Sequence, residues 1–406
     1  MTSSPGQTGG SPGHDATCDE HPRYYEHLGR YSDWVEFARR QAAPGRSPVA
    51  RLTPALVRQS LGFATDQGPI EPRVERTWQA DGVDGEEVSW SVGYGPRTMA
   101  WALRPAGVRD ALPGVLALHD HGGFKFYGKE KIADGPEMPD QSVIELRQRH
   151  YGGRAFANEL ARQGFAVLVH DTFLWGSRRF ELEEMVPETA PSPEVAWLTA
   201  ATVTGSGDDD VRARAEGIEV FNRLAATHEH VVAKYCTLLC TSLAGVVAYE
   251  DRVALQYLKG HPGVLGDRLG CIGLSGGGCR AALLQATSPD ISVSVVVGMM
   301  STYDQLLDRH VATHTWMLFP PGLMSLGDWP DLASSRAPSP LIVQYCRDDE
   351  LFSIEGMVQA HERIAKAYSS VGAPQNYIGE FYDGGHQFDR AMQAAAFAHL
   401  ARWGSA

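Results

Sequence analysis

One pentapeptide of the sequence has the form expected around a serine nucleophile. Gly273-Leu274-Ser275-Gly276-Gly277 follows the pattern Gly-x-Ser-x-Gly, and it stands between an apolar run and a segment with helical character. In this setting the serine lies on a strand-to-helix turn so tight that its flanking positions are glycine. The helix that follows directs its first N–H groups at the serine. Ser275 is therefore predicted to be a nucleophile.

A serine nucleophile needs a base and a group that orients the base, and candidates for both follow it in the chain. His386 comes after the last predicted strand, and an imidazole can take a proton from Ser275 and return it to a leaving group. Asp349 follows an earlier strand and is the preferred acid. Its neighbour Asp348, and Asp304 after the preceding strand, remain alternatives.

The negative oxygen of a tetrahedral intermediate needs two N–H donors. One is expected from Gly276, the residue after the nucleophile. The other is expected from His121 or Gly122, in the loop His119-Asp120-His121-Gly122-Gly123 that follows a buried strand.

Metal binding is a weaker interpretation of the same histidines. His119 and His121 form an H-x-H pair, but no third ligand stands at a convincing spacing. The triplet His228-Glu229-His230 is interpreted as the start of a helix with solvated polar groups. Cys236 and Cys240, four positions apart in a predicted helix, are poor evidence for a metal without nearby partners. No metal and no other cofactor are expected.

The elements that must hold these residues alternate between buried strands and helices. Such alternation predicts an α/β fold with a mostly parallel, doubly wound sheet covered on both faces. Ser275, Asp349 and His386 all follow strands, so they should meet at the C-terminal edge of the sheet. Eight strands are expected, at about 88–92, 98–103, 114–118, 165–169, the run that ends at 274, 291–297, 341–345 and 377–381. The main helices are expected at about 153–163, 230–260, 353–371 and 387–402.

Three further regions surround this predicted core. Residues 1–20 are rich in Ser, Gly, Pro and Thr and should form a disordered tail. Residues 21–84 are assigned to a helical N-terminal extension, and 85–406 to the catalytic domain. An insertion at about 178–227 should cap the site like a lid. The side chains expected to line a partly apolar pocket beneath it are Trp316, Met317 and Phe319.

Composition excludes several classes of function. The formal net charge is −13 and no basic run is present, so neither nucleic acid nor a membrane surface is an expected partner. The six cysteines are scattered, which favours free thiols in a reducing compartment. Without an apolar signal core or an 18-residue apolar run, a cytoplasmic protein is expected.

From about residue 85 to 403 the chain resembles the α/β-hydrolase superfamily, and within it the dienelactone hydrolase and acetyl xylan esterase-like branch. The residues that carry the resemblance are 119–123, 171–176, 273–277, 321–323, 328–331, 349–352 and 385–386. Asp120 replaces the glycine usual in the branch. The nucleophile is serine rather than the cysteine of dienelactone hydrolases proper, so a dienelactone substrate is not implied.

The resemblance implies a serine esterase that acts on a small-molecule ester through the triad Ser275, His386 and Asp349. The same triad could serve amide, peptide, thioester or C–C bond hydrolysis, or acyl transfer, because fold alone does not choose the reaction. A non-catalytic, hydrolase-like binding protein is the alternative from another class. The oligomeric state is left open.

Overall fold

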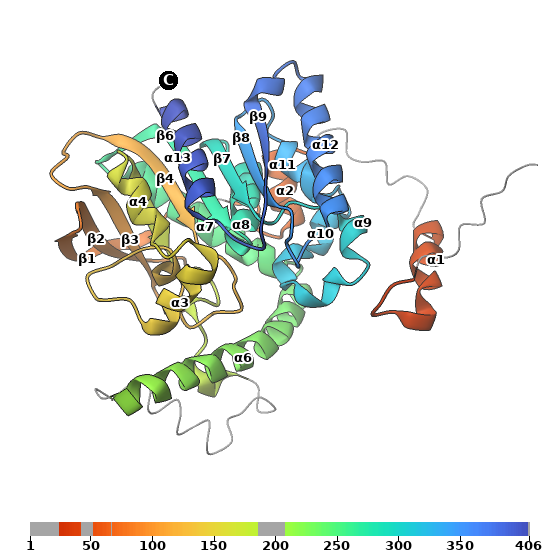
Figure 1. Ribbon diagram of the computed structural model, residues 1–406, viewed down its shortest axis with the longest axis horizontal. Coiled ribbons are helices and arrows are strands. Elements are labelled where there is room, and N and C mark those ends of the chain that lie inside the picture. Colours follow the sequence, from red (N-terminus) through yellow and green to blue (C-terminus); the bar gives the residue numbers. More distant parts are fainter. Residues whose placement is uncertain (1–23, 42–51, 66, 186–207, 405–406) are drawn as a thin grey trace, which may run out of the picture. The chain divides into compact units, whose positions relative to one another are not determined.

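A computed structural model describes residues 24–41, 52–65, 67–185 and 208–404, which fall into two compact units. The first unit, within residues 24–41, contains the 3-10 helix η1 (Gly29–Tyr31) and helix α1 (Asp33–Gln41) (Figure 1). Val35 is buried in it, whereas Trp34 is exposed. The tail expected at 1–20 lies outside the described residues.

The second unit is built on a nine-stranded sheet of order β1-β2-β3-β5-β4-β6-β7-β8-β9 (Figure 1). Strands β4 to β9 run parallel, whereas the pairs β1–β2, β2–β3 and β3–β5 are antiparallel. The mostly parallel sheet predicted from the sequence is confirmed. The strands are β1 (Ile70–Ala80), β2 (Val83–Ser91), β3 (Thr98–Pro105), β4 (Leu112–Leu118), β5 (Ala166–His170), β6 (Val264–Leu274), β7 (Ile291–Val297), β8 (Leu341–Cys346) and β9 (Tyr377–Tyr382).

Strand β1 is the ninth strand, where eight were expected. It lies in the range assigned to the helical extension, and that assignment is wrong for residues 70–80. β1 is at the end of the sheet, and most of its side chains are exposed. It also contains Pro72, which is tolerated at a sheet edge. Ile70, Pro72, Val74, Trp78 and Ala80 alternate with polar residues, which is a strand signal, but Pro72 and Arg76 interrupt it and the strand was missed.

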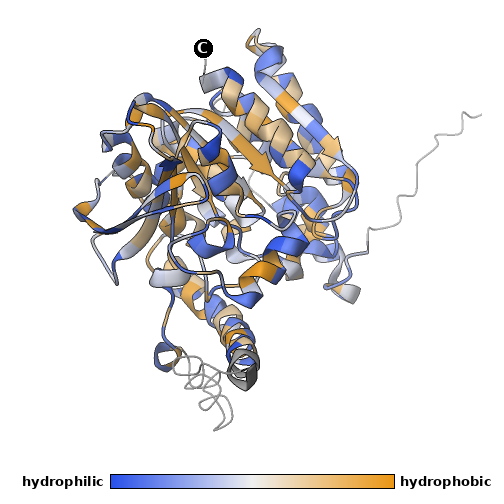
Figure 2. Cartoon of the chain, turned by 60° about the vertical axis from the view of Figure 1, so that its left-hand side comes forward, coloured by the Kyte–Doolittle hydropathy of each residue, from blue (hydrophilic) through white to orange (hydrophobic). Residues whose placement is uncertain are grey.

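Helices cover both faces of the sheet, and alternate strand residues point to opposite layers. In β4, Leu116 and Leu118 belong to one core cluster with α2, α7, α8, α11 and α12. Val115 and Ala117 belong to the other cluster, with α3, α4 and α13. The central strands are mainly apolar (Figure 2). The helices are α2 (Pro54–Ser60), α3 (Gln141–His150), α4 (Phe156–Arg162), α8 (Gly276–Thr287), α9 (Tyr303–Leu306), α10 (Pro321–Met324), α11 (Trp329–Ser334), α12 (Ile354–Ser370) and α13 (Arg390–Gly404).

The long helix expected at 230–260 is instead two helices, α6 (Asp208–Leu238) and α7 (Leu243–Gly260). The bend between them is 85°. Cys240 has a positive φ of 56°, and the Ser242 side chain caps α7 by accepting a hydrogen bond from Gly245 N at 3.1 Å. Helix α6 thus occupies the C-terminal part of the predicted insertion, whose residues 186–207 lie outside the described ranges.

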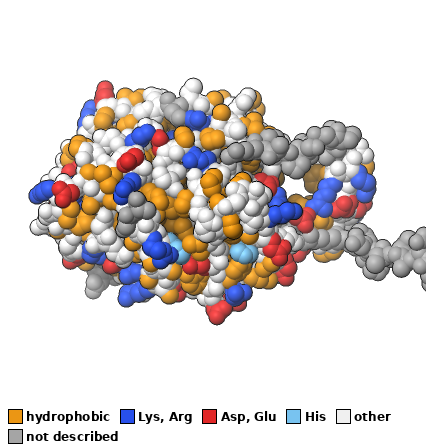
Figure 3. All heavy atoms as spheres, turned by 90° about the horizontal axis from the view of Figure 1, so that it is seen from above, with side chains coloured by type: hydrophobic (Ala, Val, Ile, Leu, Met, Phe, Trp, Pro, Cys, Tyr) orange, Lys and Arg blue, Asp and Glu red, His pale blue; other side chains and the backbone are white. Residues whose placement is uncertain are grey.

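The surface shows no field of a single charge sign on the face drawn in Figure 3, where basic, acidic and apolar side chains are interspersed. In the described part of the chain, no helix alone combines the length and apolar composition needed to cross a membrane. Among the described residues, one bent pair meets that criterion by length and composition: residues 214–238 of α6 with α7, across the 85° bend.

Candidate active site

Ser275 lies on the sharp turn between β6 and α8. Its backbone has φ 57° and ψ −120°, a combination that a non-glycine residue rarely adopts. A Cβ on Gly273 would lie 2.4 Å from the carbonyl carbon of Gly277, and one on Gly277 would lie 2.1 Å from the Leu118 oxygen. These approaches exclude side chains at both glycines, which is the steric reason expected from the sequence.

His386 and Asp349 are paired. Nδ1 of His386 lies 2.6 Å from Oδ2 of Asp349, whose side chain is fully buried. The second oxygen, Oδ1, accepts a hydrogen bond from Leu351 N at 2.9 Å. Asp348 is exposed and instead accepts a hydrogen bond from Gly384 N. The structure thus brings the preferred acid to the imidazole.

Ser275 and His386 line the same cavity, of about 270 Å³, at the C-terminal edge of the sheet. Asp304, the third candidate acid, lies on α9 and is not among the lining residues. His150, the last residue of α3, also lines the cavity, and it was not predicted from the sequence. Its Nδ1 donates a hydrogen bond to the His386 carbonyl at 2.9 Å. The apolar part of the lining is Leu274, Met299, Leu318, Leu351 and Phe352.

Of the two residues left open for the second oxyanion donor, His121 brings its backbone nitrogen close to Gly276. A Cβ on Gly276 would be only 2.6 Å from the backbone nitrogen of His121. Within the described residues neither N–H donates to a protein acceptor, and Gly276 is the first residue of α8, where N–H groups have no partner in the helix. Gly122 lines the same cavity with φ 58°.

Asp120 stands where the branch usually has glycine, and its buried contacts hold the loop of residues 119–123 in place. Its Oδ1 accepts a hydrogen bond from the Tyr151 hydroxyl at 2.5 Å, and the Lys131 ammonium contacts its carbonyl oxygen and lies 3.4 Å from Oδ2. Lys131 also donates to the His121 carbonyl at 3.3 Å. Burial lowers the pKa of Lys131 to about 8. Burial alone would raise the pKa of Asp120, but the Lys131 charge and the Tyr151 hydroxyl hold it below its usual value.

The histidines considered as metal ligands point to different partners. His119 is buried and its Nδ1 contacts the Asp120 carbonyl at 3.0 Å, whereas Nε2 of His121 contacts Glu229 at 3.0 Å. Within the described ranges, no three His, Cys, Asp or Glu side chains are grouped to hold a metal ion. The interpretation of 228–230 as a solvated helix start is wrong, since Glu229 is buried in the middle of α6.

The expected pocket residues do not line the cavity. Met317 is buried in the core, and Phe319 packs against it. Trp316 is 43% exposed and donates from Nε1 to His230 at 2.8 Å. Leu318 supplies the lining from this segment instead, because the short 3-10 helix η7 (Trp316–Leu318) turns successive side chains in different directions.

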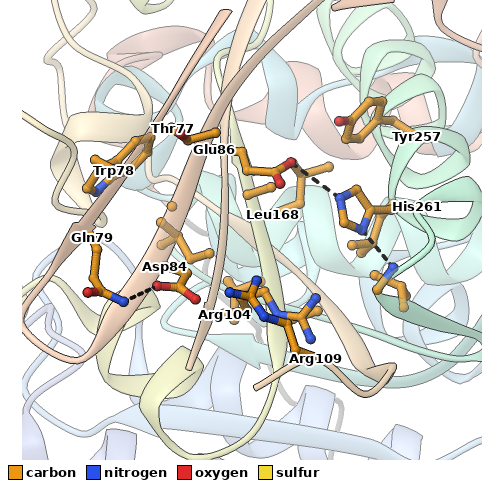
Figure 4. Close-up of a pocket in the computed structure, with 18 residues that line it drawn as sticks. Thr77, Trp78, Gln79, Asp84, Glu86, Arg104, Arg109, Leu168, Tyr257 and His261 are labelled. Carbon is orange, nitrogen blue, oxygen red and sulfur yellow. Dashed lines mark hydrogen bonds and ion pairs between the residues drawn. The ribbon is translucent and has the colours of Figure 1, made fainter. Parts of the chain in front are cut away.

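A second cavity, of about 530 Å³, shares no lining residue with the cavity that contains Ser275 and His386 (Figure 4). Arg104 and Arg109 lie side by side in it, and Glu86 contacts His261 at 3.4 Å. The first residues of β5 and β6 line this cavity, so it lies at the opposite end of the parallel strands from Ser275. Its larger size therefore does not make it the candidate active site.

Comparisons with known proteins agree with this architecture. No family model matches the chain. It is 22% identical over 347 residues to "Putative hydrolase YtaP" of Bacillus subtilis, covering 84% of this chain and 96% of that protein. Similar solved structures include a "putative acetyl xylan esterase" from Bacteroides fragilis, with TM-score 0.59, 16% identity and coverage of 90% of this chain and 84% of the other.

Two further structures extend the comparison. A glucuronoyl esterase from Solibacter usitatus has TM-score 0.57 and 12% identity, over 86% of this chain and 91% of that one. Acetyl xylan esterase 1 from Thermoanaerobacterium has TM-score 0.52 and 14% identity, over 88% and 96%. The chain therefore has the α/β-hydrolase fold, as the sequence resemblance implied.

Proposed function

We propose that this protein is a serine hydrolase that cleaves a carboxylic ester through an acyl-enzyme on Ser275. The observation that carries the proposal is the 2.6 Å contact between His386 and Asp349 beside the cavity that Ser275 and His386 line. The esterases among the similar solved structures support an ester, rather than another acyl compound, as the substrate.

In the first half of the reaction the ester acylates the serine. Because Nδ1–H of His386 donates to Asp349, Nε2 is free to accept the Ser275 proton as Oγ bonds to the carbonyl carbon. The electron pair of the C=O bond moves to the oxygen, which accepts hydrogen bonds from the N–H groups of Gly276 and His121. When the carbonyl re-forms, the C–O bond to the alcohol breaks, and His386 returns the proton to the alcohol.

Water completes the cycle in the second half. His386 takes a proton from a water molecule as its oxygen attacks the acyl carbon, and a second oxyanion forms against the same two N–H groups. Collapse of this intermediate breaks the bond to Ser275 Oγ, which recovers its proton from His386. The products are a carboxylic acid and an alcohol, and the enzyme returns to its starting state.

The test combines covalent labelling with turnover. A fluorophosphonate probe should label the wild-type protein but not Ser275→Ala, and Ser275→Ala should lose on the order of 10⁶ in kcat on the best ester of a panel. Ser325→Ala, at an exposed serine, is the matched control and should behave as wild type. Activity of Ser275→Ala within tenfold of wild type would overturn the mechanism. Faster turnover of amides or thioesters than of esters would reassign the reaction on the same triad, and absence of labelling would favour a binding protein.

A further inference from the structure

Glu229 on helix α6 accepts hydrogen bonds from two separate segments around the cavity. Its Oε2 lies 3.0 Å from Nε2 of His121 and 2.5 Å from the Lys125 ammonium. Its Oε1 accepts from the Thr315 hydroxyl at 2.7 Å and from Trp316 N at 3.0 Å. The four contacts satisfy a carboxylate that is 5% exposed. The contacts with His121 and Lys125 lower the pKa of Glu229 well below the usual value, although burial alone would raise it.

The same face of α6 holds the loop after β4 at a second place. Asn222 lies two turns before Glu229, and its Oδ1 accepts hydrogen bonds from the backbone N–H groups of Lys125, at 2.8 Å, and Phe126, at 3.0 Å. Ala225, between them on this face, offers its carbonyl to the Lys125 ammonium at 3.5 Å. Loop 121–126 is thus fastened along one stripe of the helix.

The His121 ring is fixed in one tautomer by this arrangement. Its Nδ1 accepts a hydrogen bond from Gly123 N at 3.0 Å, so the proton of the neutral ring is on Nε2 and is donated to Glu229. Burial and the Lys125 charge lower the pKa of His121, which favours the neutral ring. The ring and the backbone N–H beside Gly276 belong to the same residue, so the ring's anchor also restrains that N–H.

We propose that Glu229 is a positioning residue that aligns the His121 N–H with the oxyanion of the reaction. The inference rests on the proposed function, because it takes that N–H as an oxyanion donor. Glu229 acts through His121 and touches neither Ser275 nor His386. Its bonds to Thr315 and Trp316 join the opposite side of the cavity to the same carboxylate. Asn222 and Ala225 at the C-terminal end of the predicted insertion, together with Glu229 just beyond it, thus hold the oxyanion loop.

The experiment compares Glu229→Gln with wild type on the best ester substrate. The amide keeps the shape of the side chain but cannot accept from His121, Lys125, Thr315 and Trp316 at once. We expect kcat to fall about 10- to 100-fold, since small displacements of oxyanion donors are costly, with KM changed less than threefold. Glu219→Gln, at an exposed α6 position that forms an ion pair with Arg223 at 2.6 Å, is the matched control and should keep wild-type kcat.

A double-mutant cycle separates positioning from simple stabilisation. If Glu229 acts through the ring of His121, then Glu229→Gln should lower kcat no further in a His121→Ala background. A lower melting temperature with unchanged kcat, or additive losses in the cycle, would overturn the proposal. If Glu229→Gln does not fold, Asn222→Ala tests the same stripe, and its kcat should fall several-fold with KM retained. Unchanged kcat in that variant would overturn the proposal too.

The two proposals fail in different ways. Ser275→Ala with wild-type turnover would remove the proposed function itself. An inactive Ser275→Ala together with a fully active Glu229→Gln would leave ester hydrolysis in place and remove only the positioning role.

Discussion

Asp349 and His386 stand 37 positions apart in the chain, yet their side chains are joined by a 2.6 Å contact between Oδ2 and Nδ1. The loops after β8 and β9 bring them together, and Asp348 N donates to the Gly384 carbonyl at 3.1 Å between the same loops. Asp349 is therefore placed to fix the imidazole tautomer, while Asp348 holds the loop that carries His386.

The first prediction separates these two carboxylates. Asp349→Asn should lower kcat on the order of 10⁴, because the amide leaves His386 in the wrong tautomer. Asp348→Asn is the matched control at the adjacent position and should cost less than tenfold. Steady-state kinetics of both purified variants is the measurement. Equal effects, or the reverse order, would show that the wrong acid has been assigned.

The second prediction concerns the acyl pocket. Leu318 and Phe352 line the cavity, so Phe352→Ala or Leu318→Ala should change the ratio of kcat/KM between a short and a long acyl ester by about tenfold. Trp316→Ala, from the same segment but outside the cavity, should leave the ranking of substrates unchanged. A shifted ranking in Trp316→Ala alone would restore the pocket that the sequence suggested.

The third prediction is a loss of stability in mild acid. Burial lowers the pKa of His314 to about 4, and its Nε2 contacts the Leu351 carbonyl at 2.9 Å. Between pH 6.5 and 4 the unfolded chain binds a proton at this position that the folded protein does not, so the free energy of unfolding falls as pH falls. The His314 contribution between pH 7 and pH 5 should be about 1 to 2 kcal/mol.

Urea titrations at the two pH values measure this effect, with His314→Gln as the comparison. Burial also lowers the pKa of His119 and His121, and these groups add a slope of the same sign. The variant should therefore lose less stability than wild type between pH 7 and pH 5, without becoming insensitive to pH. Identical losses in the two proteins would contradict the assignment to His314.

The fourth prediction concerns the buried charges behind the nucleophile. Arg280 of α8 is 1% exposed, lies 2.7 Å from Asp251 and donates to the His119 carbonyl at 3.2 Å. Arg280→Met should cost about 3 to 5 kcal/mol, because it leaves the buried Asp251 without its cation. The double variant Arg280→Met with Asp251→Leu should recover part of that loss. Chemical denaturation measures both, and a neutral Arg280→Met would contradict the argument.

The features that the sequence predicted well are those with a local signal. Buried strands such as Ile291–Val297 are continuous apolar runs, and Ser275, Asp349 and His386 each follow such a run. The acid nearest the imidazole could be preferred but not decided, because Asp348 and Asp349 differ only in which one turns inward.

Other features depend on contacts between distant segments. In the sequence Glu229 resembles any other helical carboxylate. Its hydrogen bonds with His121, Lys125 and Thr315 offset the free-energy cost of burying its charge, and the sequence does not reveal those contacts. Pocket-lining residues were misassigned for a related reason, since a 3-10 turn of three residues decides whether Trp316 or Leu318 faces the cavity. Ser242 is a local signal that was overlooked, because a capping serine marks the start of α7.

Strand β1 has a consequence for how copies of this protein meet in concentrated solution. As the end strand it presents one row of backbone groups that no other strand of the described residues pairs, which is the surface on which sheets of separate molecules can join. Pro72 removes one donor from the strand, the register with β2 shifts twice, and Arg76 forms ion pairs with Glu87 and Glu137. Each of these features disfavours intermolecular strand pairing, so this edge resists the growth of aggregates through the sheet.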